Sequence, residues 1–468
     1  MSARIGANGW RRSLWRRMTP PQVFVLSFAV LVALGTLGLK LLPGIYAGAP
    51  LGWLDALFTA TSAVCVTGLI VVDTATHFTT AGQLFLLLLI QLGGLGMITF
   101  TTLIILALGR RLSLRHERLS AAAAEVAPHV PVDRLTRDVV LFTVGIEAIG
   151  ATVLYLLWGP RLGWGSAAWP AVFHAVSAFC NAGFSTFSDS LVGFQGSAGT
   201  LLTVGALVVT GGMGFLTIEE LALWARAARA RRAFRLSLHS RLALATTGVL
   251  LAAGWLLFAI FEWQATLEHL DPAGRIVNGF FLSVTPRTAG FNTIDYARAT
   301  DSTNILTIIL MFIGGSPGST AGGLKTTTVA VVALLAWHRF RGRTIPSAWA
   351  RSVPAETVQR AIGLAVVVFA LVTASIFAYT WTEHSAVDAS GSGGVRFLAH
   401  MFEAVSAFNT VGLSMGVTAT LSDPGKLLTV LLMFVGRVGP LTFAAALAVS
   451  AERQDVAYRY PYEDVVVG

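Results

Sequence analysis

Long apolar segments alternate with shorter ones along almost the whole chain. A helix that crosses a bilayer needs roughly 20 mostly apolar residues, and eight segments approach or exceed that length. They lie at residues 22–42, 81–109, 137–158, 199–224, 241–263, 303–338, 356–381 and 425–450. Within each successive pair lies a shorter, helix-like stretch, at residues 52–65, 168–180, 273–286 and 395–408. These are too short to cross and are typical of re-entrant segments, so each pair predicts a span, a half-span, a loop and a second span.

Each half-span runs into a loop that ends in glycine. The four glycines, Gly68, Gly183, Gly290 and Gly412, are 115, 107 and 122 residues apart. Ten residues before each glycine stands a phenylalanine: Phe58, Phe173, Phe280 and Phe402. A fixed long period of this kind indicates an internal repeat. We therefore predict an all-α polytopic membrane protein of four covalently linked span–pore-loop–span repeats, with eight transmembrane helices and pseudo-fourfold symmetry around one ion pore.

The repeats divide the chain as follows. We expect a cytoplasmic N-terminal segment 1–21, repeat 1 at 22–112, repeat 2 at 137–228, repeat 3 at 241–340 with a broken second helix, repeat 4 at 356–450, and a cytoplasmic tail at 451–468.

Composition agrees with a membrane protein. Hydrophobic residues make up 54% of the chain and charged residues 12%, about half the charged share of a soluble protein. Mean hydropathy is +0.70. Two cysteines are too few for a disulfide framework or a metal cluster. Cys65 and Cys180 stand three residues before their glycines, where a packing role and a redox role both remain open.

The charges predict the orientation. The formal net charge of +9 comes largely from arginines that follow the second, fourth and sixth spans, whereas the alternate connections are rich in aspartate and glutamate. Because arginine and lysine favour the cytoplasmic side, both termini and the arginine-rich connections are placed in the cytoplasm. This distribution explains the charge better than nucleic-acid binding does. The glycine loops would then be entered from outside.

The residues around the glycines suit a cation filter. Rings of backbone carbonyls replace the water shell of a dehydrated cation, and glycine permits the backbone conformations that aim them. The C-terminal ends of the half-span helices would favour a cation at the same point. The predicted cation filter consists of Val66, Thr67, Gly68, Asn181, Ala182, Gly183, Thr288, Ala289, Gly290, Thr410, Val411 and Gly412.

A second repeated feature lies in the outgoing spans, which carry glycines 25, 28, 24 and 24 residues after the filter glycines. In the sixth span this feature is too rich in glycine, and Pro317 too disruptive, for a continuous helix. We predict a mid-membrane gate of Gly314, Gly315, Ser316, Pro317, Gly318, Ser319, Thr320, Ala321, Gly322 and Gly323, with Lys325 and Arg437. A phosphate-binding loop is disfavoured because Leu324 stands where its lysine should be and no strand precedes it.

Several ionisable residues fall inside the predicted spans and half-spans. Arg437 would act as an electrostatic barrier below the filter or as a partner of the broken sixth span. Lys325 would cap the broken helix or neutralise an acid, and Arg287 would brace the third loop from behind. Glu147, Glu403 and His174, which takes the place of Glu403 in the second repeat, are expected to serve structural hydrogen bonding or packing more than ion relay.

These residues resemble the Trk/Ktr/HKT superfamily of potassium transporters. The most specific matches are Thr61–Gly68 with Leu69, Arg287–Thr293, Gly318–Thr326 and Phe402–Phe408. Eight predicted spans, and the tail from Tyr458 to Gly468, are similar to the KtrB branch rather than to TrkH, which has additional spans. By this resemblance the four glycines form the potassium filter, residues 314–323 are an intramembrane gating loop, and Arg437 is its partner. Pro317 departs from the pattern and would stiffen that loop.

The resemblance further implies potassium uptake across the inner membrane by a homodimer seated on a cytoplasmic, KtrA-type nucleotide-binding ring. Nucleotide is expected only on that partner, no covalently bound cofactor is expected, and sodium activation stays open. In the plant branch a serine replaces the first filter glycine in sodium-selective members, so Gly68 favours potassium. Two alternatives remain. An alternating-access symporter usually shows broken helices in both halves, whereas here only one outgoing span is clearly broken. A membrane-embedded enzyme would need convergent catalytic groups, which the sequence does not offer.

Overall fold

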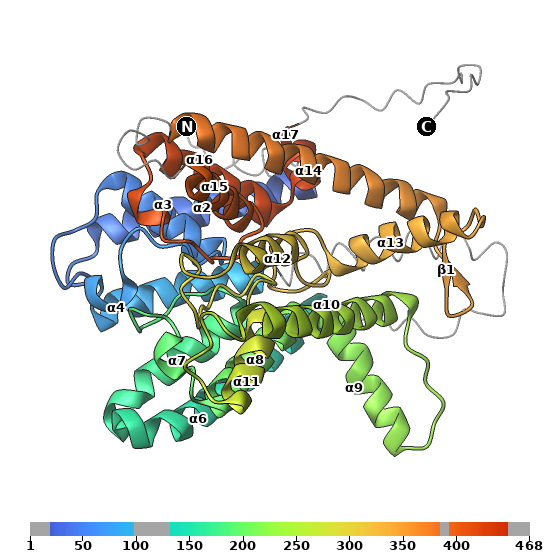
Figure 1. Ribbon diagram of the computed structural model, residues 1–468, viewed down its shortest axis with the longest axis horizontal. Helices are drawn as coiled ribbons and strands as arrows, with labels where there is room; N and C mark the ends of the chain where they lie inside the picture. The colour runs from blue at the N-terminus through green and yellow to red at the C-terminus, as the bar shows by residue number, and fades with distance from the viewer. Residues whose placement is uncertain (1–18, 98–131, 384–392, 448–468) are drawn as a thin grey trace, which may run out of the picture.

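The computed structural model describes residues 19–97, 132–383 and 393–447 (Figure 1). The predicted cytoplasmic N-terminal segment, except for its last residues, and the predicted tail therefore lie outside the described residues. So do the second predicted span beyond Met97 and most of the arginine-rich connection that follows it.

The described chain is built almost wholly of helices. In the first two predicted repeats they are α2 (Pro20–Leu41), α3 (Trp53–Val64), α4 (Thr74–His77), the helix Thr80–Met97, α6 (Val132–Leu162), α7 (Trp164–Cys180), η1 (Val192–Phe194), α8 (Ala198–Gly212) and α9 (Phe215–Arg229). In the last two they are α10 (Leu238–Glu262), α11 (Pro272–Val284), α12 (Asp301–Phe312), α13 (Thr326–Phe340), α14 (Ala355–Thr382), α15 (Gly393–Phe408), η3 (Thr418–Thr420), α16 (Asp423–Val438) and α17 (Pro440–Leu447). A two-residue antiparallel pair, β1 (Ser347–Ala348) with β2 (Arg351–Ser352), joins α13 to α14.

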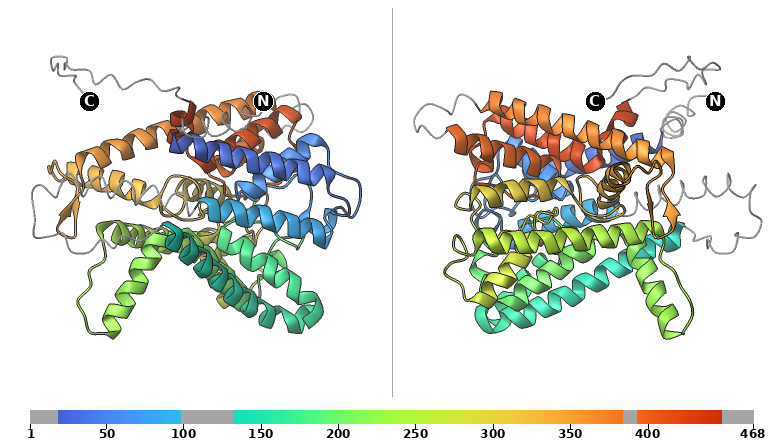
Figure 2. Two further views of the ribbon diagram at one scale, coloured as in Figure 1. Left: turned by 180° about the vertical axis from the view of Figure 1, so that it is seen from behind. Right: turned by 45° about the vertical axis from the view of Figure 1, so that its right-hand side comes forward.

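The long first helices of the predicted repeats lie at the periphery of the bundle. Between 17% and 28% of the apolar windows of α2, α6, α10 and α14 is buried, so most of each helix presents apolar side chains outward. The short helices α3, α7, α11 and α15 lie between them, and their last turns are buried. In the right-hand view of Figure 2, α14 and α10 run in roughly the same direction, with α12 and α13 between them. This arrangement is what a lipid solvent selects, because apolar side chains cost nothing on the outer surface of the bundle.

Five described helices are long and apolar enough to cross a membrane by length and composition, or six if α8 and α9 count as one span. In the stretch predicted as the sixth span, α12 ends at Phe312 and α13 begins at Thr326. The expectation that only this outgoing span is broken was wrong. Helices α8 and α9 meet at 103°.

Glycine explains the additional break. Gly214 precedes α9 with φ 85° and ψ 133°, and Gly439 separates α16 from α17 with φ 89° and ψ 132°. These angles belong to a region that is sterically closed to residues with a Cβ. The outgoing helices of the second and fourth repeats therefore break at the same place, three residues after Gly211 and Gly436.

The N-terminal ends of the outgoing helices are fixed by capping residues. Ser197, Thr300 and Ser422 are the N-cap residues of α8, α12 and α16, and each hydroxyl accepts a backbone N–H. In the last two repeats the glutamate at the end of the incoming helix also holds that cap. Glu262 accepts from the Thr300 hydroxyl at 3.0 Å, and Glu383 accepts from the Ser422 hydroxyl at 2.7 Å. The cap thus joins the two spans of a repeat.

Candidate functional site

The four loop glycines meet at one place, although they are far apart in the sequence. A Cβ on Gly68 would lie 2.3 Å from the carbonyl oxygen of Ala182, and one on Gly183 would lie 2.9 Å from the Cα of Gly290. A Cβ on Gly290 would lie 2.5 Å from the carbonyl oxygen of Val411. On Gly412 it would lie 2.0 Å from the carbonyl oxygen of Thr67. Each loop therefore contacts the next in chain order, and the fourth closes on the first. We call these four glycines the glycine ring.

All four loops have the same unusual backbone. The glycine ring has φ values of 94°, 70°, 79° and 92°, and the residue two before each glycine is also left-handed. Those residues are Val66, Asn181, Thr288 and Thr410, with φ of 56°, 60°, 68° and 51°. A positive φ is costly for any residue with a side chain, above all for β-branched ones. The same conformation recurs at two positions in each of the four loops. This recurrence indicates that the surrounding structure holds the backbone so that its carbonyl groups have fixed directions.

The short helices end where the loops begin. The last residues of α3, α7, α11 and α15 are Val64, Cys180, Val284 and Phe408, from three to six positions before the ring glycines. The C-terminal end of a helix carries a partial negative charge. Four such ends directed at one ring favour a cation there.

Hydroxyl side chains stabilise the loops from behind, a feature that the sequence analysis did not assign. Ser62 donates to the carbonyl of Leu69 at 2.7 Å and accepts from the N–H of Gly68 at 3.1 Å. Ser177 donates to the carbonyl of Phe184 at 2.8 Å. In the other repeats, Thr285 donates to the carbonyl of Phe291, and Ser406 accepts from Gly412 at 3.1 Å. In three repeats a hydroxyl-bearing residue stands six positions before the glycine, and this spacing is the sequence feature that could have predicted these bonds.

The third repeat is shorter by one residue at this point. Its hydroxyl residue, Thr285, lies five rather than six positions before the glycine. The buried phenylalanine is displaced by the same step, because Phe281 is fully buried whereas Phe280 is only half-buried. The prediction that Phe280 matches the phenylalanines of the other repeats was therefore wrong. Arg287 is 6% exposed and reaches Thr247 of α10 at 3.3 Å, on the helix behind the loop.

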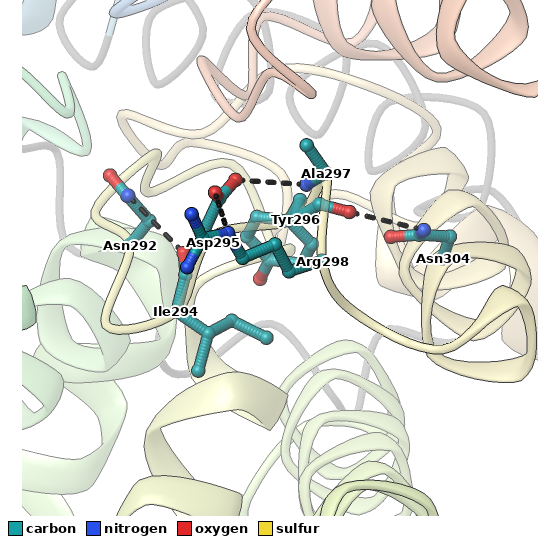
Figure 3. Close-up of polar contacts among 7 residues, drawn as sticks. All are labelled: Asn292, Ile294, Asp295, Tyr296, Ala297, Arg298 and Asn304. Atoms are coloured by element: carbon teal, nitrogen blue, oxygen red, sulfur yellow. Dashed lines mark hydrogen bonds and ion pairs between the residues drawn. The ribbon is translucent and has the colours of Figure 1, made fainter. Parts of the chain in front are cut away.

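The segment after Gly290 forms its own compact turn before α12 begins (Figure 3). Asp295 accepts from the N–H of Ala297 at 3.0 Å and lies 3.5 Å from the guanidinium of Arg298. Asn304 of α12 donates to the carbonyl of Tyr296 at 3.2 Å. Burial raises the pKa of the Tyr296 phenol, so this side chain brings no negative charge to the turn. The turn thus ties the third loop to the outgoing helix.

Residues 313–325, which we call the central loop, connect α12 to α13 and carry the predicted gate. The loop closes on itself, since the N–H of Gly314 donates to Leu324 at 2.9 Å and that of Thr326 donates to Gly315 at 3.1 Å. Ser316, Ser319, Thr320 and Ala321 are at most 1% exposed. Polar backbone buried at this depth must be paired within the protein.

The second repeat supplies many of those pairs. Ser316 and Thr320 donate their N–H groups to Gly212 at 2.9 Å and Gly211 at 3.2 Å. The Thr320 hydroxyl donates to the carbonyl of Phe179 at 3.2 Å, next to the end of α7. The N–H of Phe215 donates to Gly318 at 3.0 Å. The break between α8 and α9 thus exposes backbone groups that bind the central loop.

The fourth repeat holds the loop from the other side and links it to the first repeat. Arg437 of α16 is 1% exposed and donates to the carbonyls of Thr320 and of Gly93, the latter at 3.3 Å. Lys325 is the N-cap residue of α13, and its ammonium donates to the carbonyl of Ala321 at 2.5 Å. A Cβ on Gly322 would lie 2.7 Å from the carbonyl oxygen of Asn409, just before the fourth glycine loop. The central loop therefore lies directly beside that loop.

Glycines of the outgoing helices allow a further close approach. A Cβ on Gly93 would lie 2.0 Å from the carbonyl oxygen of Val64, and one on Gly211 would lie 1.9 Å from that of Phe179. On Gly436 it would lie 1.7 Å from that of Phe408. In each of these repeats the outgoing helix thus packs backbone to backbone against the end of its own half-span helix. A cavity of about 230 Å³ beside the central loop is lined by residues including Met97, Lys325, Phe408, Arg437 and Thr442.

The remaining ionisable candidates join neighbouring elements. Glu147 of α6 accepts from the amide of Gln91 at 3.1 Å, and the Cys180 thiol donates to Gln91 at 3.3 Å, which connects the first two repeats. Both cysteines are buried and free. Within the described residues, no three His, Cys, Asp or Glu side chains are placed to hold a metal ion.

Comparison with known proteins identifies the family. Residues 12–457 match the family TrkH, described as cation transport protein. The chain belongs to this family. It is 39% identical to the Ktr system potassium uptake protein B of Bacillus subtilis over 97% of this chain and 98% of that protein. It is 38% identical to the potassium/sodium uptake protein NtpJ of Enterococcus hirae, over 98% of this chain and 99% of that protein.

The fold agrees with this family. The crystal structure of the potassium transporter TrkH from Vibrio parahaemolyticus matches with a TM-score of 0.72, covering 92% of this chain and 86% of that one, at 18% sequence identity. The chain is therefore a multi-pass, helical cation transporter of the TrkH family.

Proposed function

We propose that this TrkH-family chain is a potassium-uptake translocation subunit whose glycine ring is the selectivity filter of a channel-like path. The observation that carries this proposal is the closed ring itself, with eight left-handed backbone positions and four helix C-termini directed at it. Carbonyl rings of this kind suit a dehydrated monovalent cation. The potassium named for the Bacillus and Vibrio relatives supports K⁺ as the substrate. Glycine at position 68 favours potassium over sodium.

The presence of eight membrane spans is the second part of the proposal. Four incoming spans and four outgoing spans give four repeats around the ring. The outgoing spans are the helix Thr80–Met97, α8 with α9, α12 with α13, and α16 with α17. The central loop is the gate in this scheme, because it lies beside the fourth filter loop and is bound by the second and fourth repeats. Arg437 holds it closed. Pulling α13 or α16 would break these contacts and free the path.

The assembly is the third part of the proposal. Relatives named as members of a Ktr system imply further subunits, and we infer a homodimer on a cytoplasmic nucleotide-binding ring of KtrA type. The chain would lie in the cytoplasmic (inner) membrane with both termini inside. Arginines in the last turns of α9 and α13, such as Arg226, Arg229 and Arg339, support this orientation, because arginine favours the cytoplasmic side of a membrane.

An alternating-access cation symporter is the second candidate. The helix breaks at Gly214 and Gly439 favour the symporter, because they occupy corresponding positions in the two halves of the chain. Broken helices in both halves are typical of such transporters. Single-subunit conductance separates the two candidates. A channel-like path gives steady ion currents through one open subunit, whereas a symporter turns over one substrate load at a time.

The filter is tested by uptake in cells that lack their own potassium transport, with Gly290→Ser and Gly412→Ser. Both substitutions place a side chain at positive φ against the neighbouring loop, so we expect potassium selectivity over sodium to fall in each. Gly363→Ser in α14 is the control, because a Cβ there meets nothing within 4 Å. Unaltered selectivity in both ring variants contradicts the filter.

A further inference from the structure

Behind the second filter loop, an imidazole holds the loop serine. The Nε2 atom of His174 lies 2.9 Å from the Ser185 hydroxyl, and its Nδ1 atom lies 2.8 Å from the carbonyl of Pro170. A carbonyl only accepts, so Nδ1 carries a proton and, in the neutral ring, Nε2 accepts from Ser185. His174 is fully buried. The Ser185 hydroxyl also accepts from the N–H of Phe187 at 2.9 Å.

The fourth repeat has the same arrangement with a carboxyl group. Glu403 is fully buried and accepts from the hydroxyl of Ser414 at 2.8 Å and from that of Thr418 at 2.5 Å. The Ser414 hydroxyl in turn accepts from the N–H of Gly416 at 3.0 Å. Each carboxyl oxygen of Glu403 therefore accepts a hydrogen bond from the segment that follows the ring glycine.

The two arrangements occupy equivalent positions. His174 and Glu403 lie nine residues before their ring glycines, and Ser185 and Ser414 lie two residues after them. In both, the serine accepts the N–H two residues farther on. Two different acceptors thus make the same bond at the same place. We call this bond, from the half-span helix to the loop serine, the brace.

The first and third repeats lack this pattern. Thr59 lies nine residues before Gly68, and its buried hydroxyl has no hydrogen-bond partner within the described residues. The first repeat has Ile70 at the serine position. In the third repeat Asn292 stands there, and its N–H is directed to Ser190 of the second repeat at 3.3 Å. The braced loops are therefore the second and fourth, which lie across the ring from each other.

We propose that Glu403 and His174 are positioning residues that determine ion specificity, by holding two opposite filter loops at a fixed distance from the pore axis. This inference rests on the proposed filter. Discrimination between K⁺ and Na⁺ requires that the carbonyl ring does not contract around the smaller ion. Two loops on opposite sides of the ring, each bonded to a buried helix, resist that contraction.

Glutamine at position 403 is the sharpest test of the brace. Glu403→Gln keeps the size of the side chain but leaves one acceptor oxygen for two hydroxyl donors. We expect sodium permeation relative to potassium to rise about five- to tenfold, the effect of one lost buried hydrogen bond to a strong acceptor. The measurement is competitive Na⁺ and K⁺ flux in proteoliposomes, with monodispersity in detergent as the check on folding.

The matched control is Thr59→Val, which changes the equivalent position of the first repeat and removes a hydroxyl that bonds to nothing there. It should leave selectivity unchanged. Ser414→Ala removes the loop partner and keeps Glu403, so it should shift selectivity in the same direction. The double variant with Glu403→Gln should add little to the single ones, because both remove one interaction.

The outcomes separate this inference from the proposed function. If Gly412→Ser alters selectivity while folded Glu403→Gln and Ser414→Ala keep that of the parent, the filter stands and the brace is wrong. If Glu403→Gln does not fold, Ser414→Ala alone decides in the same way. If Gly412→Ser also leaves selectivity unchanged, the proposed filter itself fails.

Discussion

At the scale of single residues, this molecule depends on positions where a side chain cannot fit. The ring glycines contact one another across repeats, and a second set of glycines lets the outgoing helices pack against the half-span helices. Gly436 is the most crowded of that second set. Such close backbone packing is how helices associate in lipid, where apolar surface supplies no driving force.

Alanine at Gly436 tests this packing. Its Cβ would lie 1.7 Å from the carbonyl oxygen of Phe408, so α15 and α16 must separate, at a cost of about 1–3 kcal/mol. We expect a lower melting temperature in detergent and less uptake. Gly363→Ala is the control, since it meets open space within a helix and should keep or slightly raise stability. Equal melting temperatures for the two variants would refute the packing role.

At the scale of elements, the outgoing spans differ far more than the incoming ones. The second and fourth break at an equivalent glycine, and the third is interrupted by the whole central loop. The broken end of α8 leaves carbonyls at Gly211 and Gly212 that the central loop uses. One broken helix therefore provides the partners for the next, and buried backbone remains paired.

Shortening the central loop tests its role as a gate. Deletion of residues 316–320 removes the N–H groups bound to Gly211 and Gly212 and the carbonyl bound to Arg437. If the loop closes the path, potassium flux through the isolated protein in vesicles should rise. Unchanged or weaker flux in a well-folded deletion would count against the gate. A deletion of equal length in the exposed connection 341–345 is the control and should leave flux unaltered.

At the scale of the whole molecule, the fourth repeat closes on the first. The Lys426 ammonium of α16 lies 2.7 Å from the Asp55 carboxylate of α3, and Arg437 reaches Gly93 nearer the central loop. These contacts join residues more than 340 positions apart and complete the circle that the glycine ring requires. The side chains of Lys426 and Asp55 are 15% and 31% exposed, so water screens the pair only in part.

Lys426→Met should therefore loosen the junction between the repeats. We expect a loss of about 1 kcal/mol, measured as a lower melting temperature in detergent, and the loss should shrink at high salt. Arg360→Met is the matched control, because its pair with Glu356 spans 4.0 Å with both side chains about 70% exposed. A double change of Asp55→Asn with Lys426→Met that destabilises by the sum of the two single changes would show that the ion pair contributes nothing.

The sequence by itself determined the elements that depend on local composition. Apolar length located the four half-span helices to within a few residues, and the period of Gly68 and its counterparts located the loops. The run from Gly314 to Gly323 located the broken sixth span. These features are readable because glycine, proline and apolar length act on the chain within a few residues of themselves.

Only the tertiary structure decided how distant segments meet. It placed the four loops in a closed ring, shifted the third repeat by one residue so that Phe281 is buried, and broke the fourth predicted span at Gly214. It also gave Glu403 and His174 their serine partners. A buried break or polar group is stable only where the folded protein supplies the missing hydrogen bonds. The bonds that join the central loop to the second and fourth repeats all connect residues more than a hundred positions apart.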